Sequence, residues 1–234
     1  MDQSSPRGRS VNVAIPKKHY PAKMGGVTEL LRALNFCGSG CFLIKCDWVA
    51  AYKHFWIRPE QRKYQYFKLL GRVFTEVCLT FGNSSSPGLF NRGARLVVLL
   101  VVLLVSFHIF LTIQHLDDLV AVAPARSKLA FFYDTYKRVC GEIGVVLAGD
   151  EDCEKAFAPC REGQCLGITF NTEAWIWSLG EEKVARYANS CLDLAAKDTA
   201  TLQEVMSVEG KIQDLQPDEG SSSGGTSGYQ GQSD

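Results

Sequence analysis

Three aspartates stand where apolar runs end, and these residues have the types and spacing for metal chemistry. Asp47 follows the apolar run 41–46, and the adjacent Asp117 and Asp118 interrupt the apolar stretch 109–123. Neighbouring carboxylates in apolar surroundings repel each other and lose hydration, so a cation or water must compensate them. Carboxylate oxygens are ligands that Mg²⁺ prefers. The acids therefore indicate a divalent metal site; an ordinary hairpin is the alternative, because Asp also favours turns.

The apolar runs beside these acids predict the elements that position them. Residues 41–47 form a nearly continuous apolar run that is typical of a central strand buried on both faces. The stretch 109–123 predicts two short strands around a tight polar turn. Before it, a buried helix at about 88–105 is expected to run into a buried strand at about 107–114. Each acid would then lie at a strand end.

Charge is distributed unevenly along the chain, although the net charge is zero. The 234 residues are 46% hydrophobic and 21% charged, which is enough to bury a sizeable core. Residues 1–120 carry 15 Lys and Arg against 7 Asp and Glu, whereas residues 121–234 carry 10 against 18. A basic half that holds clustered acids favours a polyanionic partner brought to a metal site. A surface dipole without function is the alternative.

The nine cysteines bear on the cellular compartment. Their number is odd and no apolar signal segment precedes them, which favours reduced thiols in an intracellular protein of the cytoplasm or nucleus. Their spacings lack the paired Cys-x2-Cys pattern that is typical of zinc sites.

One segment fits a different class of protein. Residues 96–113 carry no charge and are long enough to span a membrane. Ser106, His108 and Thr112 make the second half polar for lipid, and two acids follow it. We therefore expect no membrane partner, and a membrane protein spanning at 96–113 is the lesser alternative.

Further motifs accompany the acids in a fixed order. They are Asp47-x3-Ala51-Tyr52, then Phe81-Gly82 with Ser86-Pro87-x2-Phe90, then His115-Leu116-Asp117-Asp118, then Lys155, and finally Leu166-Gly167-Ile168. In this order the motifs resemble the reverse transcriptase family over about residues 11–212. The Phe-Gly loop, the Leu-Gly-Ile segment and residues 208–212 most resemble the polymerases of DIRS-type tyrosine-recombinase retrotransposons.

The resemblance implies an α+β fold. It would be a polymerase palm with an antiparallel sheet and packed helices, partial fingers and a truncated helical thumb. Residues 1–20 would be a flexible basic arm or a remnant of the fingers, residues 21–180 the fingers and palm, and residues 181–215 a helical thumb fragment. The Ser/Gly-rich residues 216–234 are predicted to be a disordered tail.

The resemblance also implies RNA-directed DNA polymerisation by a retrotransposon domain. A primer 3′-hydroxyl would attack the α-phosphate of a deoxynucleoside triphosphate, with two Mg²⁺ ions, or Mn²⁺ in their place, held by Asp47, Asp117 and Asp118. The partners would be an RNA or DNA template–primer duplex and deoxynucleoside triphosphates. The sequence does not indicate an oligomeric state.

Family roles carry over to further positions. Lys155 would protonate the pyrophosphate leaving group, with an ordinary solvated lysine as the alternative. Tyr52 is a candidate steric gate against ribonucleotides. Nucleotide and template contacts are expected from Tyr52, Phe81, Gly82, Ser86, Pro87 and Phe90, and primer contacts from His115, Leu166 and Gly167. His115 stands where the family usually has Tyr or Phe, which alters the contact with the primer end.

A catalytically silent remnant is the main alternative function. The finger strands that close on the triphosphate would be expected upstream of residue 11. Only a short arm stands there in this sequence. Such a remnant would be truncated, and it would bind nucleic acid through its basic half without catalysing transfer.

Overall fold

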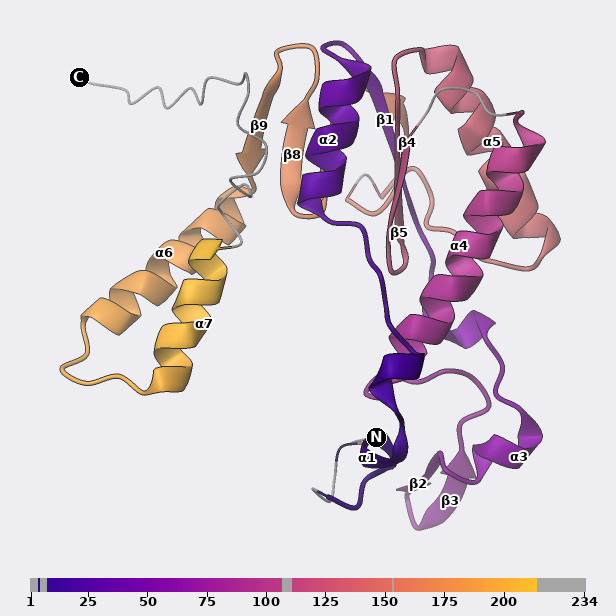
Figure 1. The fold of residues 1–234 in the computed structure, drawn as a ribbon, viewed down its shortest axis with the longest axis vertical. Coiled ribbons are helices and arrows are strands. Elements are labelled where there is room, and N and C mark those ends of the chain that lie inside the picture. Colours follow the sequence, from indigo (N-terminus) through magenta and orange to yellow (C-terminus); the bar gives the residue numbers. More distant parts are fainter. Residues whose placement is uncertain (1–3, 5–7, 107–110, 153, 214–234) are drawn as a thin grey trace. The chain divides into compact units, whose positions relative to one another are not determined.

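The computed structural model describes residue 4 and residues 8–106, 111–152 and 154–213. The chain divides into two compact units, Met1–Ser178 and Leu179–Asp234. Figure 1 shows the strands and helices that make up each unit.

A four-stranded antiparallel sheet is the centre of the first unit. Its strand order is β4 (Leu111–His115), β5 (Asp118–Ala123), β1 (Phe42–Asp47) and β6 (Phe157–Cys160). β1 is an interior strand between β5 and β6, and its four middle residues are buried. The expected central strand and the expected pair of strands around the two acids are both confirmed.

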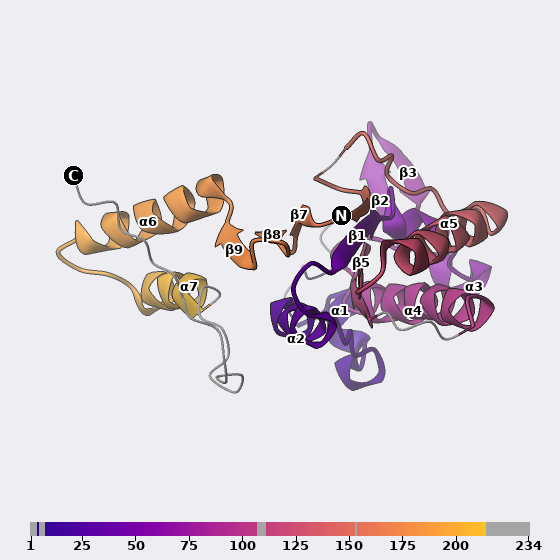
Figure 2. The same cartoon turned by 90° about the horizontal axis from the view of Figure 1, so that it is seen from above.

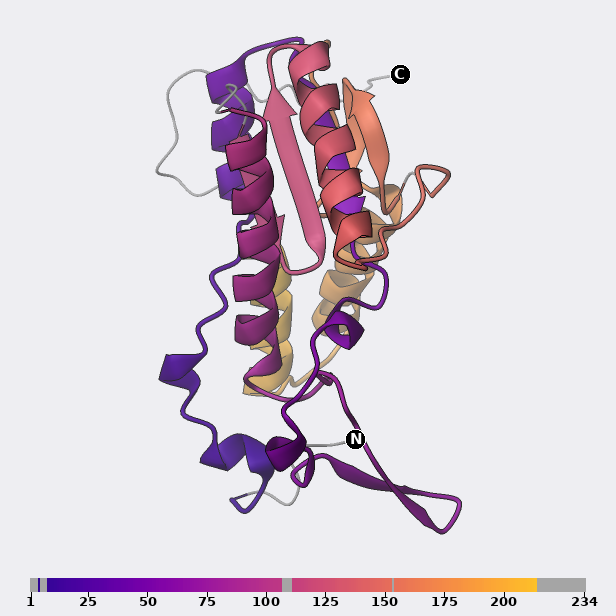
Figure 3. The same ribbon diagram turned by 90° about the vertical axis from the view of Figure 1, so that its right-hand side faces the viewer.

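Two helices cover one face of this sheet. They are α4 (Ser86–Leu104) and α5 (Arg126–Glu142), which stand side by side in front of the strands in Figure 3. Alternate residues of β1 and β5 pack into one buried core with both helices, namely Ile44, Cys46, Leu119, Ala121 and Ala123. On the other side, α2 (Val27–Cys37) lies against β4 and β5 (Figure 2).

The apolar segment that includes α4 is not one continuous helix. α4 ends at Leu104 and β4 begins at Leu111, so the helix expected at 88–105 is confirmed and a single helix over 96–113 is not formed. Residues 107–110 of the expected strand lie outside the described residues. By length and composition alone, α4 is apolar enough to cross a membrane, and 33% of its most apolar window is buried. Its sheet-facing side is buried, and its other side exposes leucines at positions 96, 99, 100, 103 and 104.

Smaller elements complete the first unit. The loop after β1 carries η2 (Ala51–His54), α3 (Pro59–Arg62) and a hairpin of β2 (Tyr66–Leu69) with β3 (Arg72–Thr75). A separate three-stranded sheet contains β7 (Glu162–Cys165), β8 (Ile168–Asn171) and β9 (Ile176–Leu179).

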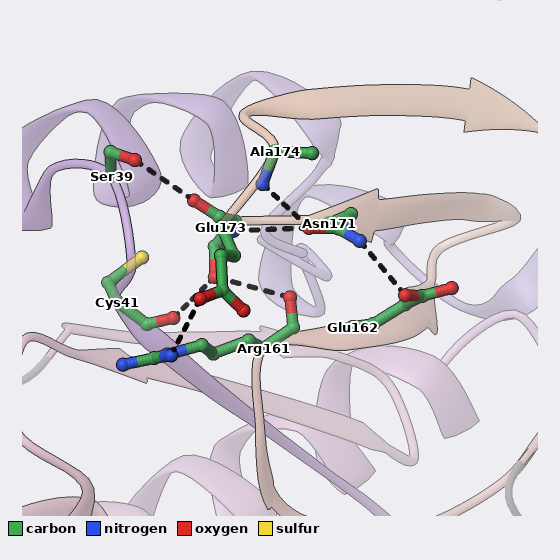
Figure 4. Close-up of polar contacts among 8 residues, drawn as sticks. Ser39, Cys41, Arg161, Glu162, Asn171, Glu173 and Ala174 are labelled. Atoms are coloured by element: carbon green, nitrogen blue, oxygen red, sulfur yellow. Dashed lines mark hydrogen bonds and ion pairs between the residues drawn. The ribbon is translucent and has the colours of Figure 1, made fainter.

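Hydrogen bonds attach this second sheet to the start of β1 (Figure 4). The Thr172 hydroxyl donates to the Cys41 carbonyl at 2.6 Å, and the Gly40 amide donates to the Thr172 carbonyl at 2.8 Å. The Asn171 carboxamide oxygen accepts from the amides of Glu173 and Ala174, which closes the turn between β8 and β9. The β8–β9 turn is thereby fixed against the strand that ends in Asp47.

The N-terminal arm contains two short helices. They are α1 (Val11–Ala14) and η1 (Lys17–His19). The Asn12 carboxamide donates to the Gly82 carbonyl at 2.6 Å and accepts from the Ser84 amide at 2.8 Å. Two backbone groups of the loop before α4 thus find partners on the arm, and this holds the arm in place.

The second unit contains α6 (Glu181–Ala195) and α7 (Leu202–Gln213), which pack against each other. A capping box begins α7: the Thr201 amide donates to the Glu204 carboxylate at 2.8 Å, and the Glu204 amide donates to the Thr201 hydroxyl at 3.3 Å. The Lys211 ammonium donates to the Ser190 hydroxyl at 2.8 Å, which links the two helices. The predicted disordered tail at 216–234 lies outside the described residues.

Candidate active site

Strand register brings the three aspartates to one end of β1 and β5. Asp47 is the direct antiparallel partner of Asp118, and such partners have Cβ atoms about 4.5–5.5 Å apart on the same face of the sheet. Asp117 lies in the β4–β5 turn, and its carbonyl accepts a hydrogen bond from the Trp48 amide at 3.3 Å. Residues about seventy positions apart in sequence therefore form one acidic group.

The β4–β5 turn is tight, and a side chain of β4 donates hydrogen bonds to its backbone. His115 pairs with Asp118, which leaves only Leu116 and Asp117 in the loop. Leu116 has φ of 50°, a left-handed conformation that costs a non-glycine residue about 1 kcal/mol or more. The Gln114 side-chain amide donates to the carbonyls of Leu116 and Asp118. These hydrogen bonds offset the conformational free-energy cost of Leu116 and fix the backbone of Asp117 and Asp118.

Burial and mutual repulsion change the acidity of two of these carboxyl groups. Burial, followed by the charges of Asp117 and Asp118, raises the pKa of Asp47 to about 6. Burial also raises the pKa of Asp118, while the nearby charge of Lys45 opposes that shift. Burial and like charge therefore disfavour the ionised form of both carboxyl groups, and a bound cation would favour it.

Lys45 is a residue of this site that the sequence analysis missed. Only 9% of it is exposed, although it is charged. Its ammonium lies 3.4 Å from an Asp118 carboxylate oxygen and donates to the Glu154 carbonyl at 2.7 Å. The signal in the sequence was a lysine inside an apolar strand, two residues before Asp47 and hence on the same face.

The donor set fits a divalent metal in chemistry, because all three groups are hard carboxylate oxygens on adjacent backbone positions. The side chains do not yet form a metal cage. Among the described residues, no three His, Cys, Asp or Glu side chains converge closely enough to hold an ion. Coordination of one ion by all three acids would therefore require their side chains to rearrange.

An aromatic cluster lies directly beside the acids. Tyr52 is 8% exposed, its ring centroid lies 4.9 Å from that of Phe81 and 5.6 Å from that of Phe90, and Phe81 is 81% exposed. Burial raises the pKa of Tyr52, and the charge of Asp117 adds to this effect. Phe90 is completely buried and also contacts Trp48. It can therefore support Tyr52 but cannot contact a ligand itself.

The loop between Phe81 and α4, together with the first turn of α4, contains Gly82, Ser86 and Pro87, three of the residues expected to contact nucleotide or template. Gly82 has φ of 84°, a conformation that favours glycine. Ser86 and Pro87 form the first turn of α4. Ser86 is completely buried, and its hydroxyl has no hydrogen-bond partner in the described part of the chain. Because its side chain is completely buried, Ser86 points inward and is not available to a ligand.

Lys155 lies within electrostatic range of Asp47. The Asp152 carboxylate, 3.1 Å from the Lys155 ammonium, raises the pKa of Lys155, and Asp47 adds a smaller contribution. The same loop is tied to β1, because the Ala148 amide donates to the Asp47 carbonyl at 2.9 Å. The exposed ammonium is thus held by Asp152, on a loop that is hydrogen-bonded to the end of β1.

The predicted primer-contacting residues lie at the end of β4 and in the turn between β7 and β8. A ring nitrogen of His115, Nδ1, lies 2.7 Å from the Gly25 carbonyl oxygen, so this histidine is held by the segment before α2. Leu166 and Gly167 form the two-residue turn between β7 and β8, with φ of 54° and 76°. Two positive φ angles are typical of a type I′ hairpin turn.

Comparison with solved structures identifies the fold. No family model and no curated protein matches the sequence. A foamy viral protease-reverse transcriptase in complex with double-stranded DNA has a TM-score of 0.62 and 16% identity, covering 88% of this chain and 32% of that chain. In complex with an RNA/DNA hybrid, such a protein has a TM-score of 0.59 and 17% identity, covering 82% of this chain and 23% of that one.

These similarities show a reverse-transcriptase-like fold. The chain spans about a third or less of the length of the solved structures that it resembles. The predicted α+β class with an antiparallel sheet and packed helices is confirmed. At this level of identity, the likeness defines the fold and leaves the chemistry to be argued from the site.

Proposed function

We propose that the chain is an RNA-directed DNA polymerase domain of a retrotransposon, most similar to the DIRS type. The observation that carries the proposal is the register of Asp47 opposite Asp118 with Asp117 in the adjoining turn. A reverse-transcriptase-like fold with these acids at one strand end supports nucleotidyl transfer. In this proposal residues 21–180 are fingers and palm, and residues 181–215 are a thumb fragment.

Each residue near the acids has a role in the proposed reaction. Asp47, Asp117 and Asp118 would hold two Mg²⁺ ions or Mn²⁺, and bound there the metal supplies Lewis-acid stabilisation of charge on the phosphate oxygens. Lys155 would donate a proton to the departing pyrophosphate, because its exposed ammonium lies on the loop that hydrogen-bonds to the Asp47 carbonyl. Tyr52, whose ring contacts Phe81 and Phe90 and is 8% exposed, would exclude a ribose 2′-hydroxyl by its bulk.

The proposed partners are a template–primer duplex, of RNA or DNA template, and deoxynucleoside triphosphates. The similar solved proteins hold double-stranded DNA or an RNA/DNA hybrid, which supports a duplex as the partner. An intracellular setting is part of the proposal, since the eight described cysteines are all free: 37, 41, 46, 78, 140, 160, 165 and 191.

Primer extension on an RNA template tests the proposal. The wild-type chain should extend a DNA primer with deoxynucleotides in millimolar Mg²⁺, and Asp117→Asn should not, because it removes a ligand charge while keeping the side-chain size. Equal extension by both proteins would refute the assignment. Tyr52→Ala should admit ribonucleotides more readily, and unchanged sugar selectivity would refute only the gate.

A catalytically silent duplex-binding module is the second candidate. It is favoured by one specific observation: in the described part of the chain, no three potential ligand side chains converge, and Asp118 is paired with Lys45. Binding of a labelled template–primer duplex, weakened by salt as expected for phosphate contacts, with no extension in either Mg²⁺ or Mn²⁺, would support this candidate. Extension in either metal would exclude it.

A further inference from the structure

Lys45 is an internal cation at the acidic group. It is the only Lys, Arg, Asp or Glu among the buried side chains of the described residues. A buried ammonium is retained only where anions and hydrogen-bond acceptors compensate its lost hydration. The compensation comes from two sides: the Asp118 carboxylate on β5 and the Glu154 carbonyl on the loop before β6.

The position of Lys45 links two parts of the candidate site. Asp118 is an expected metal ligand, and Glu154 is the residue directly before Lys155. One ammonium group therefore touches both the acid-bearing strand and the backbone of the loop that presents the candidate proton donor. The loop has a separate anchor at Asp150, which receives hydrogen bonds from Tyr133 and Lys137.

Electrostatics gives Lys45 a definite effect on metal affinity. In the absence of metal, its ammonium, 3.4 Å from an Asp118 carboxylate oxygen, offsets part of the negative charge of the acidic group and holds Asp118. A divalent ion placed among the acids is repelled by the same ammonium and must draw Asp118 towards itself. Lys45 thus stabilises the metal-free site and opposes metal binding.

We propose that Lys45 is a positioning residue that competes with a divalent metal for Asp118 and tethers the Lys155 loop to the acidic group. This inference rests on the proposed function for the identity of the metal site. It does not require turnover, because both effects are properties of the folded chain. Removing the charge should strengthen metal binding and loosen the loop, which is opposite to the effect of removing a ligand.

Calorimetric titration of Mg²⁺ into the metal-stripped full chain tests the competition. Lys45→Met should lower the Mg²⁺ dissociation constant by about threefold or more, because it removes a like charge near the ion. Lys45→Arg keeps the charge and should restore an affinity close to wild type. Lys137→Met, the matched control, weakens the other loop anchor without altering the charges beside Asp118 and should leave the affinity unchanged. If Lys45→Met does not fold, Lys45→Gln provides the same neutral substitution.

Amide hydrogen exchange in EDTA tests the tether. Peptides that contain Glu154 and Lys155 should exchange several-fold faster in Lys45→Met than in wild type, while peptides of α5 should be unchanged. Unchanged or weaker Mg²⁺ binding in the neutral variants overturns the competition, and unchanged exchange overturns the tether. A wild type that binds no Mg²⁺ overturns the proposed function and the competition together, and exchange alone then decides the tether.

Discussion

The two faces of the β1–β5 strand pair have opposite characters. On the α4–α5 face, Ile44, Cys46, Leu119 and Ala121 are apolar and at most 2% exposed. On the other face, Leu43 and Val122 are equally buried at one end, but the opposite end carries Lys45, Asp47 and Asp118. Because successive side chains of a strand point to opposite faces of the sheet, neighbouring residues of one strand lie in different environments.

This difference separates stability from chemistry within a single strand pair. The packed face gains free energy by burying apolar surface against two helices. The charged end lacks that gain, because its carboxylates are partly desolvated and repel one another. Adjacent residues such as Asp118 and Leu119 should therefore respond differently to substitution, one in activity and the other in stability.

The largest expected effect is on the charged end. Asp118→Asn should reduce primer extension by about a hundredfold or more, since it removes a ligand whose metal stabilises charge in the transition state. The protein should remain folded, with an unchanged far-ultraviolet circular dichroism spectrum, because the packed face is untouched and the Lys45 ammonium keeps its hydrogen bond to the Glu154 carbonyl. Residual extension above a tenth of wild type would show that Asp118 is not required.

On the packed face, Leu119→Ala should lower the free energy of unfolding by about 2–5 kcal/mol, because it leaves a cavity at a fully buried position. Urea denaturation measures the change. Below the unfolding transition, the Mg²⁺ affinity of the variant should stay within about twofold of wild type, because the Leu119 side chain lies on the face opposite the acids. A loss of metal affinity as large as that in Asp118→Asn would contradict the separation between the two faces.

The parts that sequence could predict are those carried by local patterns. The apolar runs predicted β1, β4 and β5, and the motif order indicated which acids meet. The contribution of Lys45 was missed because its role depends on cross-strand register and on the Glu154 carbonyl 109 positions away. The contact of Asn12 with Gly82 was missed for the same reason. A hydrogen bond between a side chain and a backbone group 70 positions away leaves no periodic pattern in the sequence.

A smaller effect is expected in the packed core next to the acids. Trp48 follows Asp47, is 2% exposed and donates its indole N–H to the Tyr136 hydroxyl at 2.6 Å. Tyr136→Phe removes the acceptor and leaves a buried donor unpaired, which should cost about 1–3 kcal/mol in the free energy of unfolding. Tyr133→Phe is the control, because the Tyr133 hydroxyl donates to the partly exposed Asp150. Urea denaturation should show a smaller loss of unfolding free energy in this variant. An equal loss of unfolding free energy in both variants would show that the buried Trp48–Tyr136 hydrogen bond stabilises the fold no more than the Tyr133–Asp150 bond.

The smallest effect concerns the pH dependence of the charged end without metal. The pKa of Asp47 rises from 3.8 to about 6 on folding, so the folded state binds more protons than the unfolded state between these values. The stability contribution of this group is therefore fully present below pH 4 and is lost as the pH rises through 6. Asp47→Asn cannot ionise and should lose this dependence, while Asp118 retains part of it.

Melting temperatures in EDTA at pH 4.5 and pH 7 measure this effect. The melting temperature of Asp47→Asn relative to wild type should rise by on the order of 2 °C between the two pH values, since solvent screens a partly exposed group. Millimolar Mg²⁺ should reverse the order at pH 7, because a metal bound to carboxylates favours their ionised form and stabilises only the wild type. If wild type and variant changed in parallel with pH, and responded equally to Mg²⁺, the acids at the end of β1 and β5 would be ordinary surface carboxylates rather than a metal site.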